Sequence, residues 1–229
     1  MLLVSRWFSP TAMQGYRPNP VAQYAIQLMR AQRGGKELPV APEIRAATYI
    51  ENVAYFAGAY RSVDGRVLNF LAEGDHLSFI HKDQKIVLEA SGDGVCVAPD
   101  ADFSRFSLAF GRADAKDPKS AVVEVGWGSD WFVKAEYKGP KTFDYPKGWN
   151  AYLGHYRNEN NWIGSIRITM RKGVLMADGV TPLEEGKDGL FRMRSEEADT
   201  EWIQFHDIVN GHAMRIKLSG EDLWRVLAP

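Results

Sequence analysis

The chain has 229 residues, of which 45% are hydrophobic, and its formal net charge at pH 7 is -1. This length allows one large domain or two small ones with a substantial core. The charge gives no general reason to expect a nucleic-acid partner, and no window approaches the roughly 18 uninterrupted apolar residues of a membrane span. We therefore expect a soluble, globular protein without a membrane span.

The opening segment, residues 1–10, has only a short apolar run, which Arg6 interrupts. It lacks the core of a secretory signal, so we predict no signal peptide and, for the chain as written, a cytoplasmic location. The single cysteine, Cys96, lies in an alternating run and is typical of a small buried strand residue rather than a nucleophile.

A helix is predicted over residues 20–34, within an N-terminal arm and Pro-containing linker that end at residue 47. Its apolar residues fall on one stripe, which must be buried against the β-units, a second copy of the chain or a separate catalytic domain. The partner-binding candidates on this stripe are Val21, Tyr24, Leu28 and Met29.

From Val53 onward, short alternating runs separated by turn signals replace the helical period. We predict eight strands in a first unit, residues 48–138, and eight in a second unit, residues 139–229. Those of the first unit include the runs 85–90, 103–110 and 131–137, and the turns of the second include Asp178-Gly179 and Asn210-Gly211. Eight antiparallel strands can close into a small barrel and so remove exposed edges. The fold class is therefore mainly β, with two tandem barrels or half-barrels after one helix. A single larger barrel built from both units is the alternative.

The two units are copies of one pattern. Phe56-Ala-Gly-Ala-Tyr60-Arg61 returns 96 positions later as Tyr152-Leu-Gly-His-Tyr156-Arg157. Near the end of each unit, Gly128-Ser-Asp130 matches Gly220-Glu-Asp222. Ordered matches of this kind predict the same architecture in both units.

The helix, the linker, the Tyr-x-Gly-x-Tyr-Arg opening and a second unit ending in Leu218-Ser-Gly-Glu-Asp-Leu-Trp-Arg follow one another in a specific order. This order, over residues 19–229, resembles the C-terminal region of β-lactamase-like serine hydrolases, the penicillin-binding-protein, D-aminopeptidase and esterase relatives. The resemblance implies lipocalin-like β-domains that accompany a catalytic domain. It also implies that the helix is the counterpart of the last helix of that catalytic domain, which this chain lacks.

The catalytic domain of that family depends on Ser-x-x-Lys, and no serine here is followed by a lysine three residues later. Tyr156-Arg-Asn158 spells the family's Tyr-x-Asn, but Tyr60-Arg-Ser62 takes the equivalent place in the first unit, so the repeat explains the match. A Gly-x-Ser-x-Gly elbow is also absent. We carry over no catalytic residue and predict no cofactor.

Aromatic residues crowd the end of the first unit and the start of the second, where they can fill a barrel or line an apolar pocket. Filling is favoured for so small a barrel. Arg61 and Arg157, which follow the repeated tyrosines, suggest either structural pairs with Asp130 and Asp222 or an anion-binding rim. The ligand-binding candidates are Tyr60, Arg61, Trp127, Trp131, Tyr156, Arg157 and Trp162.

Two histidine groups are candidate metal ligands, His206 with Asp207 and His212, and His76 with His81. Neither group has a third strong ligand, so we predict no metal site. The β-region holds 22 of the 28 Lys/Arg but 27 of the 29 Asp/Glu, which argues against a nucleic-acid groove.

Our first hypothesis is a non-catalytic lipocalin-like accessory or binding module that packs on a partner or gates an apolar ligand. The alternative is a small stand-alone hydrolase acting on an ester or amide in a barrel mouth, with His155 or His206 as base. Because Ala59 of the first copy has become His155 in the second, we expect an acquired site to lie in the second copy.

Overall fold

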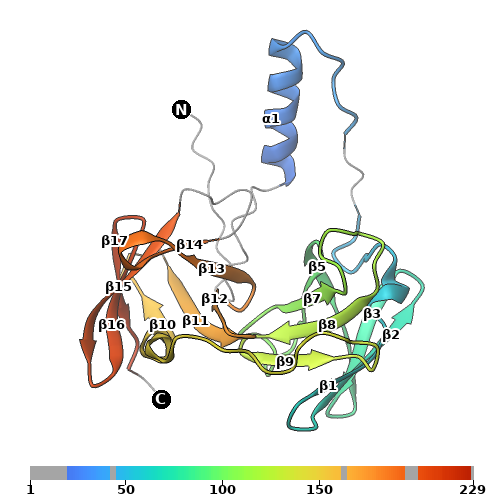
Figure 1. Cartoon of the computed structure of the whole chain (residues 1–229). Helices are drawn as coiled ribbons and strands as arrows, with labels where there is room; N and C mark the ends of the chain where they lie inside the picture. Colours follow the sequence, from blue (N-terminus) through green and yellow to red (C-terminus); the bar gives the residue numbers. More distant parts are fainter. Residues whose placement is uncertain (1–19, 42–44, 161–163, 194–200, 228–229) are drawn as a thin grey trace.

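The computed structural model describes most of the chain, with the backbone alone for residues 20–23. The described residues are 20–41, 45–160, 164–193 and 201–227. One helix precedes two antiparallel sheets that share no strand, a first sheet that nearly closes and a second that is a closed barrel (Figure 1). The predicted mainly β fold with two barrels is confirmed, and the alternative of one larger barrel is wrong.

The helix is α1 (Pro20–Arg33), and short 3-10 turns are η1 (Val53–Tyr55), η2 (Lys147–Tyr152) and η3 (Lys187–Gly189). The first sheet contains β1 (Gly58–Ser62), β2 (Val67–Glu73), β3 (His76–His81), β4 (Gln84–Val87), β5 (Glu89–Gly92), β6 (Val95–Val97), β7 (Leu108–Arg112), β8 (Val122–Trp127) and β9 (Asp130–Val133). The second contains β10 (Gly154–Arg157), β11 (Ser165–Arg171), β12 (Val174–Ala177), β13 (Thr181–Glu185), β14 (Leu190–Met193), β15 (Trp202–Val209), β16 (His212–Leu218) and β17 (Glu221–Arg225).

The predicted helix is confirmed within one residue. The Gly34 N–H donates to the Arg30 carbonyl at 3.0 Å, and this bond closes the last turn. No helix of the described residues is long and apolar enough to cross a membrane.

The first unit has nine strands rather than the predicted eight, because the run 85–90 divides at Leu88. β4 pairs with β3 and β5 pairs with β6, so the two edges of the sheet are consecutive in the chain. Leu88 joins them, is fully buried, and donates its N–H to the Leu77 carbonyl at 2.8 Å. The first sheet therefore nearly closes at a bend between its two edge strands, β4 and β5, which are not paired with each other.

The second barrel closes at the equivalent place with an unbroken strand. The first half of β13 pairs with β12 and the second half with β14. Leu183, the counterpart of Leu88 in the repeat, is 3% exposed. The two units therefore have the same strand order, with one break in the first copy.

Two predicted strands of the first unit are shorter than expected. The run 103–110 becomes a strand only at Leu108, because Phe103 and Phe106 pack their rings on Trp127 and hold the preceding residues in turns. The run 131–137 stops at Val133, after which the Tyr137 N–H closes a turn on the Lys134 carbonyl at 3.1 Å.

The repeated tyrosines occupy the centre of each barrel. Tyr60 and Tyr156 are fully buried, and each hydroxyl donates to the carbonyl four residues earlier, at 2.8 Å and 2.7 Å. A cation lies over each ring: Lys134 Nζ is 5.0 Å from the Tyr60 centroid, and Arg225 Cζ is 5.1 Å from that of Tyr156. The sequence motif is thus an interior feature that fixes the opening strand of each barrel.

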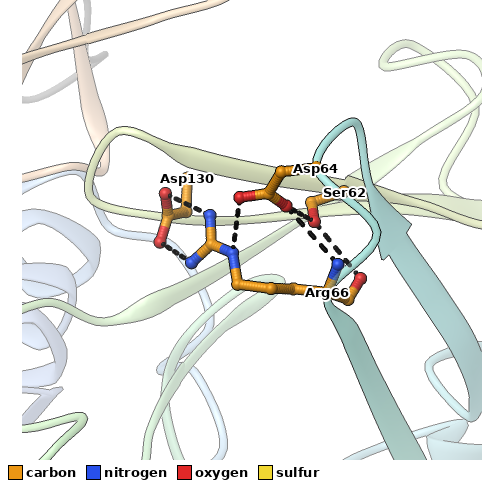
Figure 2. A network of polar contacts seen from close by, with 4 residues as sticks. All are labelled: Ser62, Asp64, Arg66 and Asp130. Atoms are coloured by element: carbon orange, nitrogen blue, oxygen red, sulfur yellow. Dashed lines mark hydrogen bonds and ion pairs between the residues drawn. The ribbon is translucent and has the colours of Figure 1, made fainter.

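A polar network ties the ends of the first barrel's strands together (Figure 2). Arg66, just before β2, forms a two-pronged ion pair with Asp130, the first residue of β9, at 2.7 Å and 2.8 Å. Its Nε also donates to Asp64 at 2.8 Å, and Asp64 accepts the Ser62 hydroxyl. Residues 64 positions apart are thereby held side by side, where β1 meets β9.

We expect Tyr156→Phe to lower the free energy of unfolding by about 1 kcal/mol, because it removes the hydroxyl that donates to the Tyr152 carbonyl. Tyr60→Phe should cost a similar amount. Urea unfolding measures both. Tyr145→Phe, which alters an exposed tyrosine, is the control and should stay within about 0.5 kcal/mol of the parent. An equal loss in this control would contradict the assignment.

Candidate functional site

The barrel interiors are filled by the chain's own aromatic side chains. In the first barrel, Phe70 packs against Tyr60 and Phe110 with ring centroids 5.5 Å and 5.1 Å apart. In the second, the Tyr152 ring stacks flat on Phe205 at 4.0 Å. Aromatic filling, which the sequence analysis favoured over a lined pocket, is what the interior packing shows.

Two hollows lie on the outside of the fold. One, of about 400 Å³, is lined by Val209, Asn210, His212, Met214, Arg225, Val226 and Leu227. The other, of about 250 Å³, is lined by Val97, Ala98, Pro99, Asp100, Ala101, Ser104, Phe106 and Ser107. Neither contains any of the ligand-binding candidates named from the sequence.

The ligand-binding candidates do not form one site. Tyr60 and Tyr156 lie inside separate barrels, and Trp127 packs against the first core with its Nε1–H directed at the Phe106 carbonyl, 3.1 Å away. Trp131 instead donates to Glu124 at 2.8 Å. Trp162 falls outside the described residues.

The two repeated arginines are not paired as expected. Asp130 pairs with Arg66 instead of Arg61, and Asp222 accepts from Arg215 at 2.8 Å instead of from Arg157. The predicted structural pairs are therefore wrong. Arg66, just before β2, and Arg215 of β16 bind these two carboxylates instead.

The two candidate bases lie on different parts of the second barrel. His155 is on β10 and His206 on β15, with β16 and β17 between these strands. The Nε2 atom of each is buried without a hydrogen-bond partner. Among the described residues, neither imidazole is hydrogen-bonded to a serine, threonine or cysteine side chain.

The histidines weighed as metal ligands are arranged differently from the expectation. Asp207 bonds to Arg215 at 2.7 Å, and His76 Nδ1 lies 3.0 Å from the Thr48 carbonyl. His81 has acidic neighbours that sequence reasoning missed: ligand atoms of His81, Asp100 and Asp102 all lie within 4.8 Å of one another. Lys82 also forms an ion pair with Asp102, so its ammonium already neutralises part of the charge of this carboxylate. The group has the atoms for a cation, but its charges are already partly matched.

The two barrels are joined by a polar seam that sequence reasoning missed. Arg171, at the end of β11, donates through Nη1 to the Gly179 carbonyl at 2.7 Å and to the Gly128 carbonyl of the first barrel at 3.2 Å. Burial lowers the pKa of Arg171 to about 10, and Glu124 partly opposes the shift. This partly buried guanidinium connects the two barrels through carbonyls of both units.

Gly126 makes room for this guanidinium. A Cβ at Gly126 would lie 2.2 Å from Arg171 Nη1. Beside it, Lys172 pairs with Glu124 at 2.8 Å. A glycine inside a strand often marks a close approach of this kind, and this was the available sequence signal.

Asp178 lies in the buried turn between β12 and β13 and is 6% exposed. Its Oδ1 accepts the Arg167 N–H at 2.8 Å, and its own N–H donates to the Arg167 carbonyl at 2.7 Å. Burial raises the pKa of this carboxyl to about 7, although the Arg167 contacts partly oppose the shift. The Asp178-Gly179 sequence predicts a turn but gives no sign of this burial.

Comparison of the chain with protein-family models, curated proteins and solved structures found no match. The resemblance to the tail of a β-lactamase-like hydrolase therefore stays a hypothesis that rests on the residues quoted for it.

We expect Gly126→Ala to lower the free energy of unfolding by about 1–3 kcal/mol, because the new methyl group displaces Arg171 from the seam. Urea unfolding followed by tryptophan fluorescence measures the loss. Gly148→Ala is the matched control, since a Cβ there meets nothing within 4 Å.

An Arg171→Ala background separates the steric effect from a general loss of strand stability. There, Gly126→Ala should cost less than about 0.5 kcal/mol, because the clashing group is gone. An undiminished cost would show that the clash with Arg171 is not the cause.

Asp178 should make stability depend on pH. Its pKa in the folded state, about 7, lies above its usual 3.8, so its favourable contribution is complete below about pH 4 and is lost as the pH rises through 7. Asp178→Asn should remove this fall, measured by urea unfolding at pH 4.5, 6 and 7.5. The control is Asp188→Asn, an exposed side chain in the next Asp-Gly turn. If both variants keep the full pH dependence, the assignment to Asp178 is wrong.

Proposed function

We propose that this chain is a non-catalytic, lipocalin-like accessory module that packs on a separate protein domain through α1. The observation that carries the proposal is the position of the helix, which stands apart from both barrels (Figure 1). An isolated helix of 14 residues is marginal in water, so a partner surface is needed to hold it.

The contacts of α1 support this role. The Tyr24 hydroxyl donates to the Pro39 carbonyl at 3.1 Å, and Ala31 is buried. Pro39 belongs to the segment that follows the helix in the chain. Ile26 and Met29 remain 43% exposed, and Leu28 is half-buried. The side chain of Val21, the fourth predicted contact, falls outside the described residues. The helix thus keeps apolar surface for another chain.

The filled interiors favour a surface role over gating of an apolar ligand. A pocket inside either barrel would require displacement of packed rings such as Phe70 or Phe205, and core rearrangements of this kind are costly. The class of partner comes from the sequence resemblance, in which the helix belongs to the catalytic domain of a serine hydrolase. We propose a domain of that kind as the surface that α1 contacts.

Hydrogen exchange of the purified chain, combined with its mass in solution, tests the proposal. We expect a monomer in which the α1 amides exchange quickly while those of β11 and β16 are protected, because α1 lacks its partner. Protected α1 amides in a monomer would show that the chain buries the helix itself and would overturn the proposal.

A pair of variants tests the second copy as the partner. The double variant Tyr24→Asp, Leu28→Asp changes two apolar residues of α1. If the parent chain forms a dimer and this double variant is a monomer, α1 binds a second copy and the separate-domain proposal is wrong. Val63→Asp is the control, because that side chain is 83% exposed on the first barrel.

A further inference from the structure

The outer wall of the second barrel carries a group of cations on β10 and β11. His155 lies directly opposite Arg167, and Arg157 lies opposite Ser165, in the antiparallel register. Tyr156 and Ile166 point into the core, so these four residues share the outer face. The register alone therefore brings an imidazole, two guanidinium groups and a hydroxyl to one surface.

The first barrel lacks this group at the same place. Its register sets Ala59 opposite Asn69 and Arg61 opposite Val67. The interior tyrosine is common to both copies, so the backbone that supports the two faces is the same. The first copy has an Ala–Asn pair where the second has a His–Arg pair. Because the interior tyrosine is the same in both copies, packing of the core does not require this change on the outer surface.

A further cation comes from the first barrel. The loop that carries Arg105 reaches the seam, because a Cβ on Gly179 would lie 3.1 Å from the ring of the neighbouring Phe106. Gly179 follows Asp178, whose backbone bonds to Arg167. Arg105 is near enough to act electrostatically on His155. We name His155, Arg157, Arg167 and Arg105 the outer basic cluster.

Within the described part of the chain, the guanidinium groups of the outer basic cluster form no ion pair, and the carboxyl of Asp178 acts on the Arg167 guanidinium only through its electrostatic field. Among the described residues, no side chain forms an ion pair or hydrogen bond with the guanidinium of Arg105, Arg157 or Arg167. Arg66 and Arg215, by contrast, are each paired with two carboxylates. The Oδ1 of this buried carboxyl accepts the Arg167 backbone N–H instead of binding the guanidinium.

His155 responds to this environment. Its Nε2 is buried and lacks a hydrogen-bond partner. Burial lowers the pKa of His155, and the charges of Arg167, Arg157 and Arg105 lower it further. Like charges repel, so an anion beside these guanidinium groups would offset the repulsion.

We propose that the outer basic cluster binds a phosphate-type dianion, either free or as the monoester of a small molecule. Guanidinium groups bind phosphate oxygens through paired N–H donors. Three guanidinium groups carry three positive charges, which match a dianion better than a singly charged carboxylate. The exposed Arg157 and Arg105 give the anion access from solvent, and Ser165 adds a hydroxyl. This site is separate from α1 and does not depend on the partner role proposed above.

Titration with inorganic phosphate, followed by NMR of the His155 imidazole, tests the site. The ionic strength is held constant with chloride. We expect a saturable shift of the His155 signals and a rise in its pKa, because the anion offsets the neighbouring positive charges. Arg157→Gln and Arg167→Gln should each weaken binding about tenfold, since each removes a charge-assisted contact. Arg157 is exposed, so its variant keeps the test valid if Arg167→Gln unfolds the chain.

The repeat supplies the matched control. Arg61→Gln alters the same position in the first barrel, where the guanidinium is also exposed, and it should leave phosphate binding unchanged. No saturable shift in the parent chain, or an equal weakening by Arg61→Gln, would overturn the proposal. Acetate that binds as tightly as phosphate would overturn the dianion assignment. Titration with glycerol phosphate separates the two sources: tighter binding than that of inorganic phosphate identifies a monoester, and equal binding identifies the free ion.

Discussion

The orientation of the two barrels depends on the Arg171 guanidinium, which lies across Gly126 and bonds to carbonyls of both units. Because these partners are neutral, the buried charge is held by geometry rather than by an ion pair, and only glycine leaves the space. The nearby Lys172–Glu124 pair adds a second, charged connection. The same contact brings the turns at Gly128 and Gly179 together, and with them the loop that presents Arg105 to the second barrel. The seam thus determines which side chains can meet outside the barrels.

The repeat separates what folding requires from what it leaves free. Each interior keeps a buried tyrosine bonded to its own backbone and a buried leucine where the strand order closes, Leu88 or Leu183. Packing constrains these positions, because a change in side-chain volume destabilises a close-packed core. Outer positions have no such constraint, and there the copies differ, as His155 in place of Ala59 shows. Divergence on a shared scaffold is therefore informative about function.

Local patterns predicted the helix, the turns and the barrel class, because these depend on neighbouring residues. The Asn210-Gly211 turn, for example, adopts the positive φ angles that its sequence favours. Alternation also indicates which face a strand residue occupies, but not which distant side chain it meets. Arg66 was therefore not predicted as the partner of Asp130, 64 residues away, and Arg61 was wrongly paired with it. The break at Leu88 and the burial of Asp178 were missed for the same reason: both depend on how complete sheets close and pack.

The arginines of the β-region fall into two groups with different physical roles. Arg66, Arg171, Arg215 and Arg225 direct their donors at carboxylates or carbonyls, so their charge and hydrogen-bonding capacity are used within the fold. Among the described residues, the guanidinium groups of Arg105, Arg157 and Arg167 form no ion pair or hydrogen bond, although Asp178 acts electrostatically on Arg167. The formal charge of -1 conceals this division, because acidic residues elsewhere balance the total. A bonded arginine that is removed leaves buried acceptors unpaired, whereas an unpaired one costs the fold little. Stability and anion binding are therefore carried by different residues, and a substitution can affect one without the other.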